Sequence, residues 1–312
     1  MLLGVWTVPA RAQSATAERY PNVALQTHDG RSVRFHDDLL KGKSVAIHVI
    51  YTSCTDECPL EMANLAQLQR LLGERMGRDV VFYSISIDPK TDTPAVLKDY
   101  AQRFSVGPGW TLLTGKPEDI ALLTRKLGLV RRADSAGKDG HMPMLLLGQE
   151  ATGQWMRHSA VDNPRFLHAH MKNFFGWRDA EAAPGYAQAR PLALEPGQLL
   201  FQSRCSACHT ATGEAGGSGL APDLLGVTAR RERAWLERYV AAPDRLQAQG
   251  DPTALRLAQQ YPKVRMPNLR LSSTEVASVL DHLAAEAARR PAPEPGAPAA
   301  PRKVSAGHQH HH

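Results

Sequence analysis

The sequence predicts an α/β domain followed by an all-α domain, on three observations. Residues 19–177 alternate short β-type runs with helical patterns, residues 178–195 are an Ala- and Pro-rich linker without periodicity, and residues 196–290 carry mainly helical patterns. The length of 312 residues agrees with this division, since one domain usually holds roughly 100–200 residues. We therefore expect two separate cores.

The first domain is expected to contain a central sheet covered by helices. Alternation of buried strands with amphipathic helices is typical of a three-layer arrangement. The helices begin with a first-turn proline, which favours helix initiation. The expected strands are Ser44–Tyr51, Asp79–Ile87 and Met144–Leu147, and the expected helices are Pro59–Glu74, Pro94–Phe104 and Pro117–Leu127.

The second domain is expected to open with a helix that leads into Cys205 and to close with a helix over Ser273–Arg289. Ser272 and Glu275 are spaced as a capping box at the start of the closing helix. Residues 291–312 are too rich in proline and polar residues to fold. The histidines at the end of this tail either gather metal ions or are a purification tag.

Charge and the N-terminus indicate where the protein works. Residues 1–12 are a short apolar run that ends in an Ala-x-Ala pattern, which predicts an export signal peptide. We expect a protein of the bacterial periplasm, soluble after cleavage. The net charge is +6, but the basic residues are scattered, so nucleic acid is not an expected partner. A mildly basic surface suits acidic redox partners or proximity to an anionic membrane, although it also serves simple solubility.

The four cysteines form two close pairs, and the second pair is a haem attachment motif. Cys205 and Cys208 are followed by His209 in the pattern C-x-x-C-H. In this pattern two thiols bond covalently to one haem c, and the histidine becomes an axial iron ligand. A structural disulfide or half of a zinc site is the alternative, but this half of the chain has no further cysteines to complete a zinc site.

The segment around this motif resembles the class I cytochromes c. The resemblance rests on the run Gly219–Leu224 and on the run Met266–Leu269. It implies that the Pro222 carbonyl accepts a hydrogen bond from His209 and that Met266 is the second axial ligand. Histidine and methionine together favour electron transfer.

The first pair, Cys54 and Cys58, follows an expected buried strand and opens an expected helix. A gap of four positions brings both sulfurs close enough to chelate one ion or to form a disulfide. Thiolates favour Cu(I), and a Cu(II) ion would need an additional nitrogen donor. A purely structural disulfide is the alternative.

Around this pair the chain resembles the SCO (SenC) copper proteins, which have a thioredoxin-like fold. The resemblance includes the runs Ser86–Pro89 and Asp92–Pro94. It implies that His141, which lies 87 positions after Cys54, is the third copper ligand. Asp88 is expected either to support the site or to form a turn. His158, His168 and His170 are expected to be ordinary histidines.

The SCO resemblance implies a copper metallochaperone for cytochrome oxidase assembly, and we expect the haem to give or take the electron that switches the copper and thiol site. The expected partner is the copper-site subunit of cytochrome oxidase or another periplasmic redox acceptor. Two alternatives remain open. One is a thiol-disulfide oxidoreductase that uses Cys54 and Cys58 as catalytic residues and is fed by the haem. The other is a pure electron-transfer protein or copper sensor.

Overall fold

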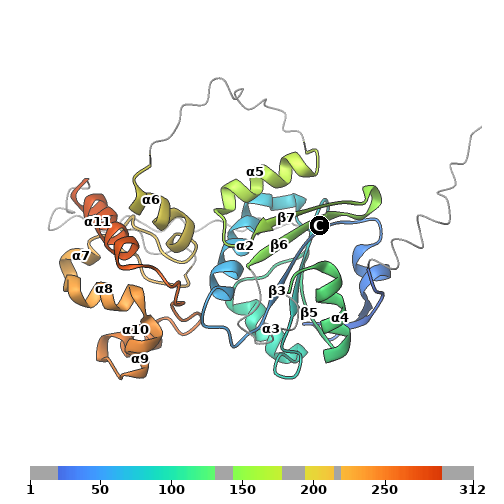
Figure 1. Cartoon of the computed structure of the whole chain (residues 1–312), viewed down its shortest axis with the longest axis horizontal. Helices are drawn as coiled ribbons and strands as arrows, with labels where there is room; N and C mark the ends of the chain where they lie inside the picture. Colours follow the sequence, from blue (N-terminus) through green and yellow to red (C-terminus); the bar gives the residue numbers. More distant parts are fainter. Residues whose placement is uncertain (1–19, 131–142, 178–193, 214–218, 290–312) are drawn as a thin grey trace, which may run out of the picture.

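The computed structural model describes residues 20–130, 143–177, 194–213 and 219–289. They form a sheet domain (residues 20–177) and a helical domain (residues 194–289), which lie side by side (Figure 1). This arrangement confirms the prediction of an α/β domain followed by an all-α domain. The predicted signal peptide, most of the predicted linker and the predicted tail lie outside the described residues and stay predictions.

Seven strands form one mixed sheet in the order β2-β1-β5-β4-β3-β6-β7. The three central strands β5, β4 and β3 are parallel, whereas β6 and β1 pair with this centre in the antiparallel sense. The strands are β1 (Ala24–Thr27), β2 (Ser32–Arg34), β3 (Ser44–Ile50), β4 (Val81–Ser86), β5 (Trp110–Gly115), β6 (Met144–Gln149) and β7 (Gln154–Ser159).

Helices cover both faces of the sheet, as the three-layer prediction requires. Successive side chains of a strand point to opposite faces, and in β3 Ala46 and Ile50 join one apolar core while Val45 and Ile47 join the other. The first core is closed by α2 (Cys58–Leu72), α3 (Pro94–Arg103) and α5 (Pro164–Phe174), and the second by α4 (Pro117–Leu127) and the π-helical turn η1 (Phe35–Leu40). The short 3₁₀ turns η2 (Gly73–Arg75) and η5 (Glu150–Thr152) complete the domain.

The helix ends follow the local sequence signals. Helix α4 begins at Pro117, and Gly128 ends it with a φ of 67°, a left-handed conformation that glycine adopts without steric cost. Helix α2 ends two residues before the predicted Glu74, because Gly73 also has a positive φ, of 52°. The predicted helices therefore agree with the structure to within two residues.

The helical domain packs short helices around the closing helix. The capping box of α11 is confirmed, since the Glu275 carboxylate accepts hydrogen bonds from the N–H and the hydroxyl of Ser272, each at 2.8 Å. Helix α6 packs against α11 at Gly197. The elements are α6 (Pro196–Leu200), the π-helical turn η7 (Phe201–Cys205), α7 (Val227–Arg230), α8 (Arg233–Ala241), α9 (Pro243–Ala248), α10 (Pro252–Gln260) and α11 (Ser273–Arg289).

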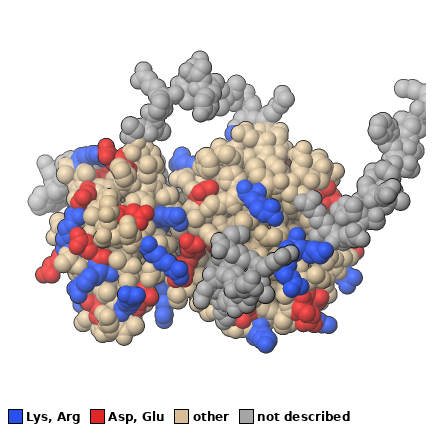
Figure 2. Space-filling view, in the orientation of Figure 1, with Lys and Arg blue, Asp and Glu red and all other residues tan. Residues whose placement is uncertain are grey.

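The two domains pack against each other. Ala207 and Leu220 of the helical domain are buried in the same apolar cluster as side chains of α2 and α5. On the face seen in Figure 2, basic and acidic side chains are interspersed over the helical domain and form no patch of one sign. Within the described part of the chain, no helix combines the length and apolar character needed to cross a membrane.

Candidate haem and copper sites

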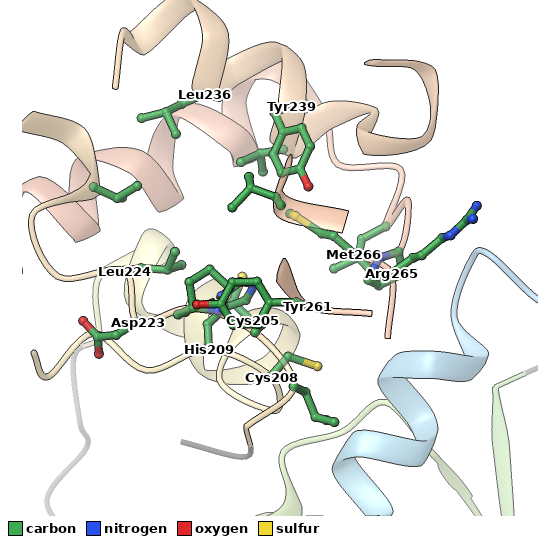
Figure 3. A pocket seen from close by; sticks show the side chains of 18 of the residues that line it. Cys205, Cys208, His209, Asp223, Leu224, Leu236, Tyr239, Tyr261, Arg265 and Met266 are labelled. Carbon is green, nitrogen blue, oxygen red and sulfur yellow. Dashed lines mark hydrogen bonds between the residues drawn. The ribbon is translucent and has the colours of Figure 1, made fainter. Parts of the chain in front are cut away.

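A cavity of about 280 Å³ opens inside the helical domain (Figure 3). Cys205, Cys208, His209 and Met266 all line it, so the fold brings together the four residues that the sequence assigned to haem. The rest of the wall is mainly apolar and includes Leu220, Leu224, Leu236, Tyr239 and Leu280. A largely apolar wall with a few convergent polar groups is typical of a cofactor site.

The imidazole of His209 is held in one orientation. Its Nδ1 lies 2.9 Å from the Pro222 carbonyl oxygen, which confirms the predicted hydrogen bond. A carbonyl can only accept, so Nδ1 carries the proton. Burial lowers the pKa of His209, with the Pro222 bond acting in the opposite sense. The neutral ring therefore keeps the lone pair of Nε2 for a metal ion.

Asp223 fixes the loop on both sides of this contact. Its carboxylate accepts hydrogen bonds from the Thr210 hydroxyl and from the backbone N–H groups of Thr212, Gly213 and Leu225. These bonds lower the pKa of Asp223, although burial acts in the opposite sense. Asp223 therefore ties the Pro222 loop to the segment that follows His209.

Cys205 and Cys208 stand in surroundings that disfavour a charge on sulfur. Burial raises the pKa of each thiol to about 12. Both would be neutral near pH 7 and weak nucleophiles toward disulfides. A thioether is also uncharged, so these surroundings suit sulfur that is covalently bonded to a porphyrin. The donor set, the apolar wall and the oriented imidazole together fit a haem c.

Met266 lies in a different segment of the domain from the Cys205–His209 motif. It lies in the loop between α10 and α11 and packs against the cluster of Tyr239, Leu246 and Ala254. In Figure 3 it enters the cavity from a different side than His209. Its role as an iron ligand stays a prediction.

Cys54 and Cys58 lie at one end of the sheet domain, where the chain leaves β3 and enters α2. Cys58 is the first residue of α2 and is fully buried, and Cys54 is 8% exposed. Both pack with Tyr51 and Ile87. No disulfide joins any of the four cysteines, all of which the structure describes.

A hydrogen bond between the two sulfurs shifts the pKa values of the two thiols in opposite directions. The bond from the Cys58 thiol, more than any other contact, lowers the pKa of Cys54 to about 6 against the effect of burial, and hydrogen bonds from the Tyr51 side chain and from backbone N–H groups of the turn add to the lowering. Burial, followed by this same bond, raises the pKa of Cys58 well above its ordinary value. Near pH 7 the pair therefore holds one thiolate and one thiol.

Asp92 is a supporting residue that sequence reasoning did not assign. It is fully buried, and its carboxylate accepts hydrogen bonds from the Thr52 N–H at 3.1 Å and from the Ser86 hydroxyl at 2.6 Å. It thereby ties the start of the cysteine loop to the end of β4. The nearby Asp88 accepts backbone hydrogen bonds from Thr91 and Asp92 through its carbonyl, which supports the turn-forming alternative for that residue.

The third proposed copper ligand, His141, lies outside the described residues. Among the residues that are described, no group of three or more His, Cys, Asp and Glu side chains is arranged to hold a metal ion. His158 and His170 contact each other across β7 and α5, with 3.2 Å between ring nitrogens. The described histidines therefore offer no alternative third ligand beside the cysteine pair.

Comparison with known proteins assigns a family to each of the two domains. The profile of the SCO1/SenC family matches residues 11–167, which is half of the chain, and the cytochrome c profile matches residues 194–285. A SCO2-like protein of Rickettsia felis is 31% identical over 134 residues, which cover 41% of this chain and 64% of that protein. Protein SenC of Rhodobacter capsulatus is 36% identical over 107 residues, 34% of this chain and 46% of that protein. The chain thus spans less than two thirds of the length of either relative.

Among solved structures, a SCO1/SenC family lipoprotein from Bacillus anthracis is 29% identical and covers 49% of this chain and 93% of its own, with a TM-score of 0.42. The copper-bound ScoI of Bradyrhizobium japonicum is 27% identical and covers 48% of this chain and 96% of its own, with a TM-score of 0.40. The profile match over half of the chain decides the assignment. The chain belongs to the SCO1/SenC family and joins to its thioredoxin-like domain a cytochrome c domain.

Proposed function

We propose that this protein is a periplasmic copper metallochaperone for cytochrome oxidase assembly. Copper is its cargo, and Cys54, Cys58 and His141 hold it. The fused haem c domain gives or takes the electron that switches the copper and thiol site between its oxidation states. The copper-site subunit of the oxidase, or another periplasmic redox acceptor, receives the copper.

The observation that carries this proposal is the state of the cysteine pair. Cys54 is a thiolate near neutral pH because its pKa is lowered to about 6, and thiolate is the form that binds soft Cu(I). Cys58 stands next to it at the start of a helix, with Tyr51 and Ile87 shielding the sulfurs. A shielded dithiol of this kind favours a tightly held but exchangeable ion.

The haem domain adds a one-electron couple beside this dithiol. Cys205 and Cys208 would carry the porphyrin, and His209 and Met266 would be the axial ligands. Bound haem supplies reversible one-electron chemistry. Tethering it to the copper domain keeps the two centres at a millimolar effective concentration, on the order of that for short flexible linkers.

The proposal is tested by titrating the haem-loaded, copper-depleted protein with Cu(I) in competition with a chelator. Cys54→Ser, Cys58→Ser and His141→Ala should each weaken binding by on the order of 100-fold or more, because even outer-shell partners of a metal ligand are worth 10- to 100-fold. His168→Ala is the matched control, since this histidine is half-buried on α5 and lies away from the pair. Unchanged affinity in the cysteine variants would refute the site.

A second candidate is a thiol-disulfide oxidoreductase, and the lowered pKa of Cys54 favours it as well. A thiolate near neutral pH is the attacking species in disulfide exchange. Transfer of copper to a copper-free acceptor distinguishes the two functions. Reduction of an acceptor disulfide without copper transfer would support the oxidoreductase, whereas copper transfer at unchanged acceptor thiol content would support the chaperone.

A further inference from the structure

The loop that carries Met266 rests directly on the loop that carries Cys54 and Cys58. The backbone N–H of Asn268 donates to the carbonyl oxygen of Thr55 at 3.1 Å. Two residues further, the Arg270 guanidinium forms an ion pair with Asp56 at 2.8 Å. Thr55 and Asp56 are two of the three residues between the two cysteines, so the helical domain contacts the turn that holds the sulfurs.

The conformation of the Met266 loop is adapted to this contact. Arg270 has a φ of 52°, which is uncommon for a residue other than glycine. The Asn268 side chain accepts a hydrogen bond from the Arg270 N–H at 3.0 Å and supports this turn. Backbone strain of this kind is kept where the surroundings require it and is frequent at functional contacts.

A second line of contacts joins the haem motif to helix α2. Gln67 of α2 donates to the Ser206 carbonyl at 2.9 Å, within the haem attachment motif. Ala207, in the same motif, is 2% exposed and packs in the core cluster that includes α2. The Arg270 side chain is 75% exposed, so its ion pair contributes little free energy by itself. The partly buried Gln67 hydrogen bond and the buried Ala207 contribute more to the packing.

Helix α2 forms part of both sites. It begins at Cys58, and Leu60, two residues later, lines the haem cavity together with Cys208 and His209. Figure 3 shows α2 as the pale blue helix beside the cavity, on the side of Cys208. Leu60 is 1% exposed, so this part of the cavity wall is closed to solvent.

We propose that the contact of residues 264–270 and 205–208 with the cysteine loop and helix α2 is the internal electron-transfer interface of this protein. The inference depends on the proposed function. In the step that the interface serves, one electron leaves the iron(II) haem and reduces a Cu(II) ion at the cysteine site, giving iron(III) and Cu(I). No proton or bond has to be exchanged.

The test compares the full-length, haem-loaded protein with the double variant Gln67→Ala/Arg270→Glu, which removes two of the contacts and places a carboxylate opposite Asp56. Arg233→Glu is the matched control, because Arg233 forms an ion pair of the same kind with Asp281 inside the helical domain, at 2.7 Å. Hydrogen exchange is measured on the copper-free protein. Haem oxidation after addition of Cu(II) to the reduced protein is then followed by absorbance at several protein concentrations.

We expect faster hydrogen exchange of the backbone amides of residues 264–270 in the double variant only. We also expect haem oxidation that is independent of protein concentration in the wild type and in Arg233→Glu, and about tenfold or more slower in the double variant, since the tether alone leaves only chance encounters. Unchanged exchange would overturn the interface itself, and faster exchange with an unchanged oxidation rate would overturn its role. If the wild type binds no copper, the proposed function fails, whereas the exchange result still decides whether the domains dock.

Discussion

Replacing Cys58 by alanine should move the acidity of Cys54 back toward that of an ordinary thiol. The Cys58 hydrogen bond is the largest cause of the lowered pKa of about 6, while burial acts against it. Without that bond, only the smaller effects of the Tyr51 side chain and of the backbone N–H groups of the turn are left to oppose burial. We therefore expect the pKa of Cys54 in Cys58→Ala to exceed about 8, close to the ordinary cysteine value of about 8.5.

The consequence can be worked out at pH 7. A thiol with a pKa of about 6 is about nine-tenths thiolate at this pH, and one with a pKa of about 8 is about one-tenth thiolate. Because the thiolate is the nucleophile, alkylation of Cys54 by iodoacetamide should slow about tenfold. The assay is mass spectrometry of the copper-free, haem-loaded protein after timed alkylation between pH 5 and 9.

Thr55→Ala serves as the control, because it changes the same exposed turn but leaves both sulfurs and the Thr55 carbonyl in place. Its alkylation profile should keep a midpoint near pH 6. A midpoint that stays near 6 in Cys58→Ala would show that the Cys58 thiol does not set the acidity of Cys54.

Three further predictions concern copper, the cysteine loop and the helix contact. Cu(I) affinity, measured by chelator competition, should rise about tenfold per pH unit between pH 7 and 8, because only Cys58 must lose a proton there. Below pH 6 it should rise about 100-fold or more per unit, because Cys54 is protonated as well. An affinity that does not change with pH would exclude the dithiol as ligand. Asp92→Ala should lower the free energy of unfolding by about 2–3 kcal/mol, because it leaves the Thr52 N–H and the Ser86 hydroxyl without their acceptor. Denaturant titration measures this loss, and the control Asp99→Ala, at an exposed position, should lower the free energy of unfolding by under about 1 kcal/mol. Equal losses in the two variants would contradict the role of Asp92 in anchoring the cysteine loop. Gly197→Ala should lower the free energy of unfolding by about 1–3 kcal/mol, because a Cβ there would lie 1.9 Å from the Ser278 carbonyl oxygen of α11. Thermal unfolding is compared with that of Leu199→Ala, a change at an exposed position of the same helix. Equal melting temperatures would refute the close packing.

The elements with strong local signals were predictable from the sequence. Helix α4 occupies the predicted Pro117–Leu127 because a proline begins it and a glycine follows it. Helix α11 occupies the predicted Ser273–Arg289 because of its capping box. By contrast, strand β7 (Gln154–Ser159) was not predicted, because it lies at the sheet edge and none of its residues is fully buried, so its sequence has no apolar run.

The candidate sites divide in the same way. The haem residues are spaced by the chemistry of the porphyrin, so the sequence alone could group Cys205, Cys208 and His209. Asp92 could not be singled out, because its partners Thr52 and Ser86 lie on two other segments and only the sheet brings them together. The contact of Asn268 with Thr55 joins residues 213 positions apart. It depends on the complementary shapes of the two folded domains, so no local sequence signal predicts it.

The hydrogen bond between His209 and Pro222 also bears on the order of events during maturation. The imidazole is oriented by the Pro222 carbonyl of its own domain, and Asp223 holds that loop in place through hydrogen bonds within the same domain. Its rotational freedom is therefore lost when the polypeptide folds and not when a metal arrives, which lowers the entropic penalty of ligation. Met266, the predicted second ligand, instead lies on a loop that hydrogen-bonds to the sheet domain, so docking of the two domains also contributes to the position of this side chain.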